Sequence, residues 1–351
     1  MELRALENDL HEWSRELGFQ QLGITDIDLR EHEAHLERWI ALERHGEMAW
    51  MARHGRRRSR PDELIPGTCS VISVRMDYLP DHAADAAQVL GSPSQAYVSR
   101  YALGRDYHKV LRKRLQSLAD RMHERVGDFG YRVFVDSAPV LEKALAQKAG
   151  LGWIGKHTNV LNKEAGSWFF LGEIYTDLPL APTAAETPAN HCGSCTACID
   201  VCPTGAIVAP YELDARLCVS YLTIEFAGSI PISLRPLIGN RVYGCDDCQL
   251  FCPWNKFAKL TSEGDFSPRH RLDEATLIEL FGWSEAQFLS RTEGSPIRRI
   301  GYERWLRNLA VALGNAPTSP AVVQCLEARL PTLSPLPGEH AQWALAQHNR
   351  G

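Results

Sequence analysis

The stretch Cys192-Gly-Ser-Cys195-Thr-Ala-Cys198-Ile-Asp-Val-Cys202-Pro203 decides how the middle of the chain folds. Its spacing, C-x2-C-x2-C-x3-C-P, is that of segments that hold a pair of four-iron, four-sulfur (4Fe-4S) clusters. Three closely spaced thiolates bind three irons of one cube, and the fourth cysteine reaches the other cluster. The proline that follows donates no N–H and keeps the backbone from coiling back.

A second run, Cys245-Asp-Asp-Cys248-Gln-Leu-Phe-Cys252-Pro253, has the same ending but one cysteine fewer. Cys218 lies between the runs and completes a set of eight, so we expect a crossed arrangement. The first cluster takes Cys192, Cys195, Cys198 and Cys252, and the second takes Cys202, Cys218, Cys245 and Cys248. Structural zinc is the alternative, because C-x2-C pairs also bind zinc. The two C-x3-C-P endings favour iron–sulfur clusters.

The composition is that of a globular chain with room for two or three domains. It has 351 residues, is 44% apolar and carries a net charge of −5, which argues against a protein that coats nucleic acid or membrane. Eight of the ten cysteines fall in one short segment, as in a metal-binding protein rather than a disulfide scaffold. The other two, Cys69 and Cys325, are expected to be buried and inert. With no apolar leader and no membrane-spanning run, we expect a cytoplasmic protein, and a monomer.

Three segments are expected along the chain: an α/β or α+β domain over 1–180, the cluster module over 181–260 and a helical region over 261–351. Residues 178–190, rich in Pro, Ala and Thr, are expected to form a linker. The patterning of the first segment predicts helices over 3–17, 106–126 and 139–149, and strands over 20–24, 71–78, 131–135 and 168–175.

The stretch Gly150-Leu-Gly152-Trp-Ile-Gly155-Lys156 imitates a nucleotide-binding loop. It follows a predicted helix rather than a strand, and His157 replaces the Ser or Thr that would hold magnesium, so we set nucleotide binding aside. We expect the glycines to let backbone approach a bulky ligand closely. Lys156, His157, Thr158 and Asn159 would then supply polar contacts.

Asp136 follows a β-patterned run and precedes Pro139. It can cap the next helix, or it can present a carboxyl at the end of a strand, where α/β sheets place ligands. In the second case burial would raise the pKa of this carboxyl and make it a general acid. The residues alone leave the two interpretations open.

Two arginine-rich runs are candidates for contact with nucleic acid, although a solvated face is the usual outcome for such runs. The second is interleaved with Tyr302 and Trp305, which suits phosphate contact and base stacking on RNA. The first run consists of Arg53, Arg56, Arg57, Arg58 and Arg60, and the second of Arg298, Arg299, Arg304 and Arg307.

Over nearly its whole length the chain resembles the epoxyqueuosine reductase family, whose cobalamin-dependent members act in queuosine biosynthesis on transfer RNA. The motifs that carry the resemblance are Tyr101-Ala-Leu-Gly-Arg-Asp-Tyr-His108, Val135-Asp-Ser-Ala-Pro139, Lys148-Ala-Gly-Leu-Gly-Trp-Ile-Gly-Lys156, Cys218-Val-Ser-Tyr-Leu-Thr-Ile-Glu225 and Tyr243-Gly-Cys-Asp-Asp-Cys-Gln-Leu-Phe-Cys-Pro-Trp254.

The resemblance implies a cobalamin-binding α/β domain, a ferredoxin-like two-cluster module and a HEAT-like helical region. It implies reduction of epoxyqueuosine to queuosine at the wobble position of an anticodon loop, with electrons from an external donor. By resemblance Asp136 is the proton donor, and the second arginine run contacts the tRNA. The residues that match stretches lining the family's cobalamin pocket are Arg58, Ser99, Lys156, His157, Thr158 and Asn159.

The chemistry gives each part a role as a hypothesis. Making an alkene from an epoxide needs two electrons and protons, and a reduced corrin can reach a carbon centre where a cluster cannot. The target base must be turned out of its stack into a pocket. The alternatives are a reductive dehalogenase-like enzyme for small molecules and a non-catalytic iron–sulfur electron carrier.

Overall fold

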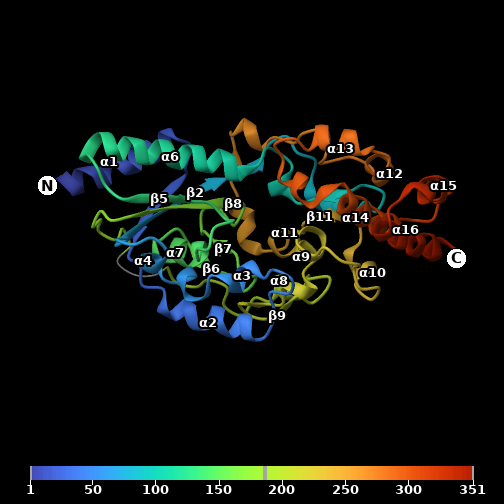
Figure 1. Cartoon of the computed structure of the whole chain (residues 1–351), viewed down its shortest axis with the longest axis horizontal. Coiled ribbons are helices and arrows are strands. Elements are labelled where there is room, and N and C mark those ends of the chain that lie inside the picture. The colour runs from blue at the N-terminus through green and yellow to red at the C-terminus, as the bar shows by residue number, and fades with distance from the viewer. Residues whose placement is uncertain (1, 185–187, 350–351) are drawn as a thin grey trace.

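A four-stranded antiparallel sheet forms the centre of the first part of the chain in the computed structural model, which describes residues 2–184 and 188–349. The strand order is β1-β2-β8-β5 (Figure 1). The strands are β1 (Gln21–Thr25), β2 (Ser70–Asp77), β8 (Phe169–Thr176) and β5 (Tyr131–Phe134). With an antiparallel sheet among helices, the domain is α+β, the second of the two expected classes.

Helices cover both faces of this sheet, which explains why β2 and β8 are buried at every position. On one face lie α1 (Glu2–Glu16) and α6 (Tyr107–Val126), whose apolar residues recur at helical spacing and pack on the sheet. Asp106 caps α6 by accepting the backbone N–H of His108 at 3.1 Å. On the other face lies α7 (Glu142–Lys148).

Shorter elements surround α7 on that second face, below the sheet in Figure 1. Among them, β6 and β7 form a hairpin, and α2 is the longest helix. The elements are α2 (Arg30–Ala41), α3 (Trp50–Arg53), η1 (Gly55–Arg58), α4 (Pro61–Leu64), β6 (Trp153–Ile154) and β7 (Val160–Leu161).

The cluster module consists of one-turn helices and short strands. The first C-x3-C-P run begins in the short helix α8 and the second begins in α11. These two helices pack together. Its elements are α8 (Ala197–Asp200), β9 (Ile207–Ala209), β10 (Glu212–Leu213), η3 (Ala215–Leu217), α9 (Val219–Ile224), α10 (Arg235–Ile238), β11 (Arg241–Tyr243), α11 (Asp247–Leu250) and η4 (Pro253–Phe257).

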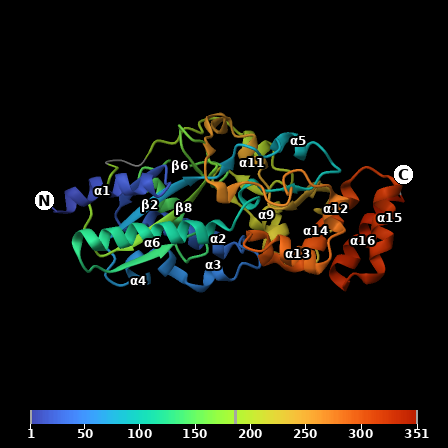
Figure 2. The ribbon, with the colours of Figure 1, turned by 90° about the horizontal axis from the view of Figure 1, so that it is seen from above.

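The C-terminal region is helical, and α14 packs on α16, α12 and β11 around a core that includes Trp305. Its elements are η5 (Gly264–Phe266), α12 (Leu277–Phe281), α13 (Glu285–Arg291), η6 (Pro296–Ile300), α14 (Gly301–Asn315), α15 (Pro320–Arg329), η7 (Leu330–Thr332) and α16 (Pro335–His348). Figures 1 and 2 place α1 and α16 at opposite ends of the molecule.

Part of the first segment pairs and packs with the two later segments. β3 (Leu79–Pro80) pairs with β12 (Leu260–Thr261), and β4 (Tyr97–Val98) pairs with β11, both in parallel. Residues 96–103, beyond α5 (Ala86–Leu90) and around η2 (Arg100–Ala102), contribute apolar side chains to the core of the C-terminal helices. The expected boundary at residue 180 therefore does not separate two independent packing units.

The strands and long helices expected from the sequence are confirmed within one or two residues, except that α7 begins at Glu142 rather than at Pro139. Most of the expected linker has no regular secondary structure, and its residues 185–187 lie outside the described part. Among the helices of residues 2–184 and 188–349, none combines the length and the apolar character needed to cross a membrane.

The glycines of the stretch 150–155 serve chain packing rather than approach to a ligand. A Cβ on Gly152 would lie 2.1 Å from the carbonyl oxygen of Leu161, across the β6–β7 hairpin. A Cβ on Gly155 would lie 2.6 Å from the Leu161 side chain. The expectation that the glycines face a bulky ligand is corrected for Gly152 and Gly155, because what approaches them closely is Leu161 of β7.

Gly152→Ala should destabilise the protein by about 1–3 kcal/mol, because the added methyl group forces the two strands of the hairpin apart. The midpoint of urea unfolding, followed by circular dichroism, measures this loss. Gly264→Ala is the matched control, because its Cβ would meet no atom within 4 Å. Equal midpoints for the two variants would contradict the packing role of Gly152.

Candidate functional site

Two adjoining cavities lie between the sheet domain and the cluster module. The first has a volume of about 450 Å³ and the second of about 560 Å³. Side chains from α7 and the loop before it line both, so they form two halves of one cleft. The residues shared by the two linings are Asp136, Glu142, Lys143 and Leu213.

Asp136 lies at the junction of the cavities, directly after β5. It adopts a left-handed backbone conformation (φ +44°), which is unusual for a residue with a side chain. Its Oδ2 accepts a hydrogen bond from the Tyr107 hydroxyl and lies 3.2 Å from His108 Nε2. The first turn of α6 therefore holds the carboxylate. The helix-cap interpretation is wrong, because the residue before α7 is Leu141, whose side chain makes no cap hydrogen bond.

The electrostatics of this group reverse one expectation. Desolvation opposes ionisation of Asp136, but hydrogen bonds from His108 and Tyr107 outweigh it and hold the pKa of Asp136 below its ordinary value. Burial alone would lower the pKa of His108, but hydrogen bonds to Asp106 and Asp136 raise it to about 9. The predicted raised pKa of Asp136 is therefore corrected: at neutral pH the proton sits on His108, and Asp136 is its partner.

Tyr107 and His108 belong to the motif Tyr101–His108, but the sequence alone assigned no role to either residue. Their signal was the capped start of a helix carrying Asp106, Tyr107 and His108 in succession. Glu142 and Lys143 were missed altogether, because nothing local distinguishes them from surface residues of a helix. Only the packing of α7 under the sheet brings them to the cleft.

Arg58 is the one member of the first arginine run that is buried, at 4% exposure, and it lines the second cavity. It donates to the carbonyl oxygens of Trp50 at 3.0 Å and Ala138 at 3.4 Å, while its Nε has no partner among the described residues. A buried donor without a partner, aimed into a cavity wall, fits a ligand with acceptor groups.

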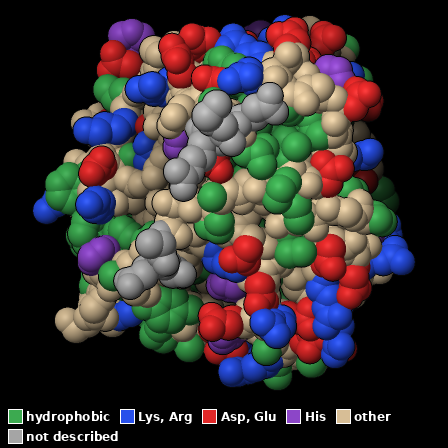
Figure 3. Space-filling view, turned by 90° about the vertical axis from the view of Figure 1, so that its left-hand side faces the viewer, with side chains coloured by type: hydrophobic (Ala, Val, Ile, Leu, Met, Phe, Trp, Pro, Cys, Tyr) green, Lys and Arg blue, Asp and Glu red, His purple; other side chains and the backbone are tan. Residues whose placement is uncertain are grey.

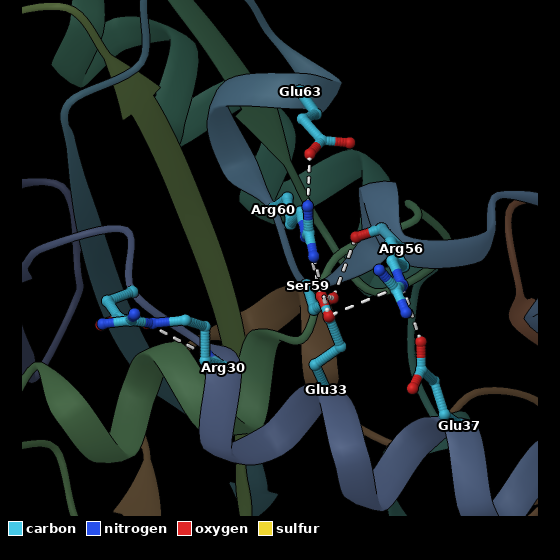
Figure 4. A network of polar contacts seen from close by, with 8 residues as sticks. Arg30, Glu33, Glu37, Arg56, Ser59, Arg60 and Glu63 are labelled. Carbon is cyan, nitrogen blue, oxygen red and sulfur yellow. Dashed lines mark hydrogen bonds and ion pairs between the residues drawn. The ribbon is translucent and has the colours of Figure 1, made fainter.

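The flanking arginines hold α2 rather than a ligand, as Figure 4 shows. Arg60 Nε contacts Glu33 at 3.0 Å, and Arg56 contacts Glu37 at 2.9 Å. These ion pairs join η1 and α2 on either side of Arg58. In Figure 3, which faces the end of the molecule that carries α1, acidic and basic side chains are interspersed rather than gathered by sign.

Four expected pocket residues follow β6, and only two of them reach the cleft. Thr158 lines the second cavity and Asn159 the first, where it accepts a hydrogen bond from Lys143 Nζ at 3.0 Å. Lys156 Nζ instead donates to two backbone carbonyls of the cysteine loop, at 2.7 and 2.8 Å. His157 is buried outside both linings, and burial lowers its pKa to about 4.

Ser99 also lies outside both cavity linings. It is 1% exposed, and its hydroxyl donates to Asp246 Oδ1 at 2.5 Å. The expectation that Ser99 and Lys156 contact cobalamin is corrected, because both side chains are committed to the loops that carry the cysteines.

The cysteines gather in two neighbourhoods that adjoin each other, since Cys248 also lies near Cys198, and their division between two clusters stays a prediction. Burial raises the pKa of the Cys198 thiol to about 11, aided by the nearby thiolates of Cys252, Cys192 and Cys195. Burial likewise raises the pKa of Cys248 well above its usual value, and its neighbours include Cys218 and Cys202. Cys218 is also a neighbour of Cys245.

The surroundings of the two groups differ. Cys218 lines the first cavity, whereas Cys195 is exposed at the surface. Among the described residues, no three His, Cys, Asp or Glu side chains lie close enough to hold a single metal ion. A four-iron cube places each thiolate on its own corner, farther apart than the ligands of one zinc ion. Outside the two groups, Cys69 is exposed rather than buried as expected, and Cys325 is half-buried.

The second arginine run divides into exposed and buried members. Arg298 and Arg299 are exposed and line a third cavity beside Lys109, and Arg299 also lines the first cavity. Arg304 is half-buried and bonded to backbone carbonyls. Arg307 is fully buried and donates to the carbonyls of residues 222, 226 and 228. Its expected contact with RNA is corrected, because no surface phosphate can reach it.

Comparison with known proteins finds likenesses in family, sequence and fold. The model of the family described as epoxyqueuosine reductase QueG, DUF1730, matches residues 58–137, and that of the 4Fe-4S double cluster binding domain matches residues 191–255. The epoxyqueuosine reductase of Pseudomonas aeruginosa is 64% identical over 98% of this chain and 94% of its own length.

Two solved structures share the fold. An epoxyqueuosine reductase with an epoxyqueuosine-modified tRNA-Tyr stem loop has 25% identity and a TM-score of 0.84 over 99% of this chain and all of that one. The Bacillus subtilis epoxyqueuosine reductase, with its catalytic aspartate loop swung out of the active site, has 27% identity and a TM-score of 0.87 over 99% of this chain and 91% of that one. On this likeness in sequence and fold, the chain belongs to the epoxyqueuosine reductase family.

Proposed function

We propose that this protein reduces epoxyqueuosine to queuosine at the wobble position of tRNA. The observation that carries the proposal is the cleft itself, in which a hydrogen-bonded Asp136, Tyr107 and His108 face a wall that contains Cys218. Acid groups and a cluster-binding cysteine on one cavity suit a reaction that consumes both protons and electrons. The relative solved with an epoxyqueuosine-modified stem loop supports the same substrate.

Cobalamin fits the two joined cavities. A corrin is broad and flat with peripheral amides, and the cleft offers both the space and a buried polar atom that has no partner among the described residues, Arg58 Nε. The residues that would hold it are Arg58, Thr158, Asn159 and Lys143. When bound, cobalamin supplies a strongly nucleophilic metal centre able to attack an epoxide carbon.

Two four-iron clusters, held by the cysteines in the crossed arrangement, would supply the electrons that an external donor provides. Cys195 of the first group is exposed at the surface, and Cys218 of the second group lines the cavity. The first cluster would therefore receive electrons from the donor, and the second would pass them to the cleft. A cluster of this kind would supply one electron at a time, so one turnover would need two such transfers.

Asp136 relays to the opening epoxide the proton that His108 holds at neutral pH. Because His108 retains its proton up to a pH of about 9, it can recharge Asp136 through their hydrogen bond. The loop that carries the catalytic aspartate of the B. subtilis relative swings out of its active site. A movable loop fits a residue that must admit a bulky base before it acts.

The anticodon loop approaches along Arg298 and Arg299, which lie at the third cavity beside the cleft. Packing of α14 and α15 on α16 supports a HEAT-like arrangement for the C-terminal region behind them. We further propose that the protein acts as a monomer in the cytoplasm, where tRNA and the external electron donor are available.

Nucleoside mass analysis tests the proposal directly. Reduced, cluster-reconstituted protein is incubated with epoxyqueuosine-containing tRNA, with and without cobalamin. Queuosine that forms only with cobalamin is the expected result. Intact clusters and bound cobalamin without queuosine would overturn the assignment.

Asp136→Asn should abolish queuosine formation, with a loss of at least about 100-fold, while both clusters remain, because the amide cannot cycle a proton. It should also lower the pKa of His108, since one of its two carboxylate partners loses its charge. NMR titration of the His108 ring measures this second effect. Queuosine formation at the normal rate by Asp136→Asn would show that Asp136 takes no part in the reaction.

Cys218→Ala should remove the cluster beside the cavity and leave the outer one, because Cys218 belongs to only one group of four. Iron analysis should fall from about eight to about four atoms per chain. Cys69→Ala, outside both groups, is the control and should retain all iron. A full iron content in Cys218→Ala would show that this thiol is not a ligand.

Arg298→Ala should weaken binding of a tRNA stem loop and reduce the salt dependence of the affinity by about one ion, as expected for a phosphate contact. Arg30→Ala, at the start of α2, removes an exposed arginine paired with Asp28 and should change neither quantity. Fluorescence anisotropy at several salt concentrations makes the comparison. If the salt dependence of the affinity is unchanged in Arg298→Ala, Arg298 does not contact a phosphate of the RNA.

A further inference from the structure

Glu142 is a second carboxyl in the wall shared by the two cavities. It is the first residue of α7 and lines both cavities together with Asp136. Its Oε2 is buried and has no hydrogen-bond partner among the described residues. Because an unpaired ionised oxygen is costly to bury, this position favours the neutral acid over the carboxylate.

The charged and titratable groups that face Glu142 are Asp136, His108, Lys143, Arg58, Glu173 and Tyr107. The nearby cations have other partners: Lys143 donates to Asn159, and Arg58 donates to two backbone carbonyls. Burial and the Asp136 carboxylate together raise the pKa of Glu142 to about 7. Glu142 therefore holds a proton near neutral pH and can release it there.

Glu173 extends this arrangement into the core. It lies in the middle of β8 opposite Ser73, is fully buried, and neither of its carboxyl oxygens has a partner among the described residues. Alternate residues of a strand share a face, so Glu173 lies on the side of Tyr175, which packs against α7. Burial raises the pKa of Glu173 well above its usual value. The interior behind Glu142 thus offers a second acid that burial keeps neutral.

The proposed reaction requires two protons. Turning an epoxide into an alkene breaks both carbon–oxygen bonds and forms a carbon–carbon double bond, and the oxygen leaves as water. Two electrons come from the external low-potential donor through the clusters. One proton converts the opening oxygen to a hydroxyl group, and a second lets that hydroxyl leave as water. The pair of Asp136 and His108 accounts for one.

We propose that Glu142 stores the second proton and passes it to the substrate oxygen through Asp136. This role rests on the proposed function, and it makes Glu142 a positioning residue for a proton rather than a group that touches the substrate. The competing role is electrostatic: a carboxylate at the start of α7 would interact with the helix dipole. Such a carboxylate would already be ionised below pH 7, and its removal would affect stability rather than the pH profile.

The test compares Glu142→Gln and Glu142→Asp with Glu327→Gln, a control on the exposed face of α15. In cobalamin-loaded, reduced protein, Glu142→Gln should form queuosine about 100-fold more slowly, with Glu142→Asp restoring part of the rate. The unsubstituted rate should fall as pH rises through about 7, and this fall should be absent in Glu142→Gln. Infrared difference spectra between pH 6 and 8, recorded without substrate, should lose a protonated-carboxyl band in Glu142→Gln only.

A normal rate and pH profile in Glu142→Gln would overturn the proposal, as would an infrared spectrum that matches the unsubstituted protein. Absence of queuosine with the unsubstituted protein would overturn the proposed function and this role with it. That result is seen before any variant is compared. The infrared titration needs no turnover, so it reports the proton on Glu142 separately from activity.

Discussion

The buried carboxylate of Asp246 joins the two halves of the chain. It accepts hydrogen bonds from the Tyr97 hydroxyl at 2.8 Å, the Ser99 hydroxyl at 2.5 Å and the Arg100 backbone N–H at 2.8 Å. Asp246 lies between two of the cluster-binding cysteines, so the loop that sets the thiol spacing also fixes a segment of the first domain. Removing one partner would leave a buried charge short of a donor, which is costly. This cost keeps the module and the sheet domain in one arrangement.

The acid site follows from that anchor, because the chain runs from Arg100 into α6. The first turn of α6 then places Tyr107 and His108 against Asp136, at the end of the edge strand β5. The left-handed conformation of Asp136 costs about 1–3 kcal/mol in isolation, and the hydrogen bonds from α6 help to offset it. The hydrogen bonds from α6 therefore hold the carboxylate at the junction of the two cavities despite its strained backbone.

Local pattern was enough where chemistry is local. Helical periodicity predicted α6 correctly, because it depends on residues close in sequence. Cysteine spacing predicts cluster ligands in the same local way, but the crossed grouping joins cysteines that lie far apart in the chain and stays a prediction. The failures depend on long-range packing. Ser99 and Arg307 look like ligand contacts in the sequence, yet each is buried and bonded to distant loops. Glu142 carries no sequence signal, because its proton affinity arises from Asp136 and from burial beneath the sheet.

In the proposed reaction, electrons and protons would reach the cleft over different distances, and different residues of its walls would supply them. A cluster held in part by Cys218 would lie in the wall of the cavity, so electrons could reach the cavity from that edge. A proton moves only within hydrogen-bond reach, directly or through one water, so its donors must line the cavity themselves. Asp136 and Glu142 do so from the opposite domain. Among the described residues, the seam between the two domains thus brings the candidate acid groups and a candidate cluster ligand to one cavity.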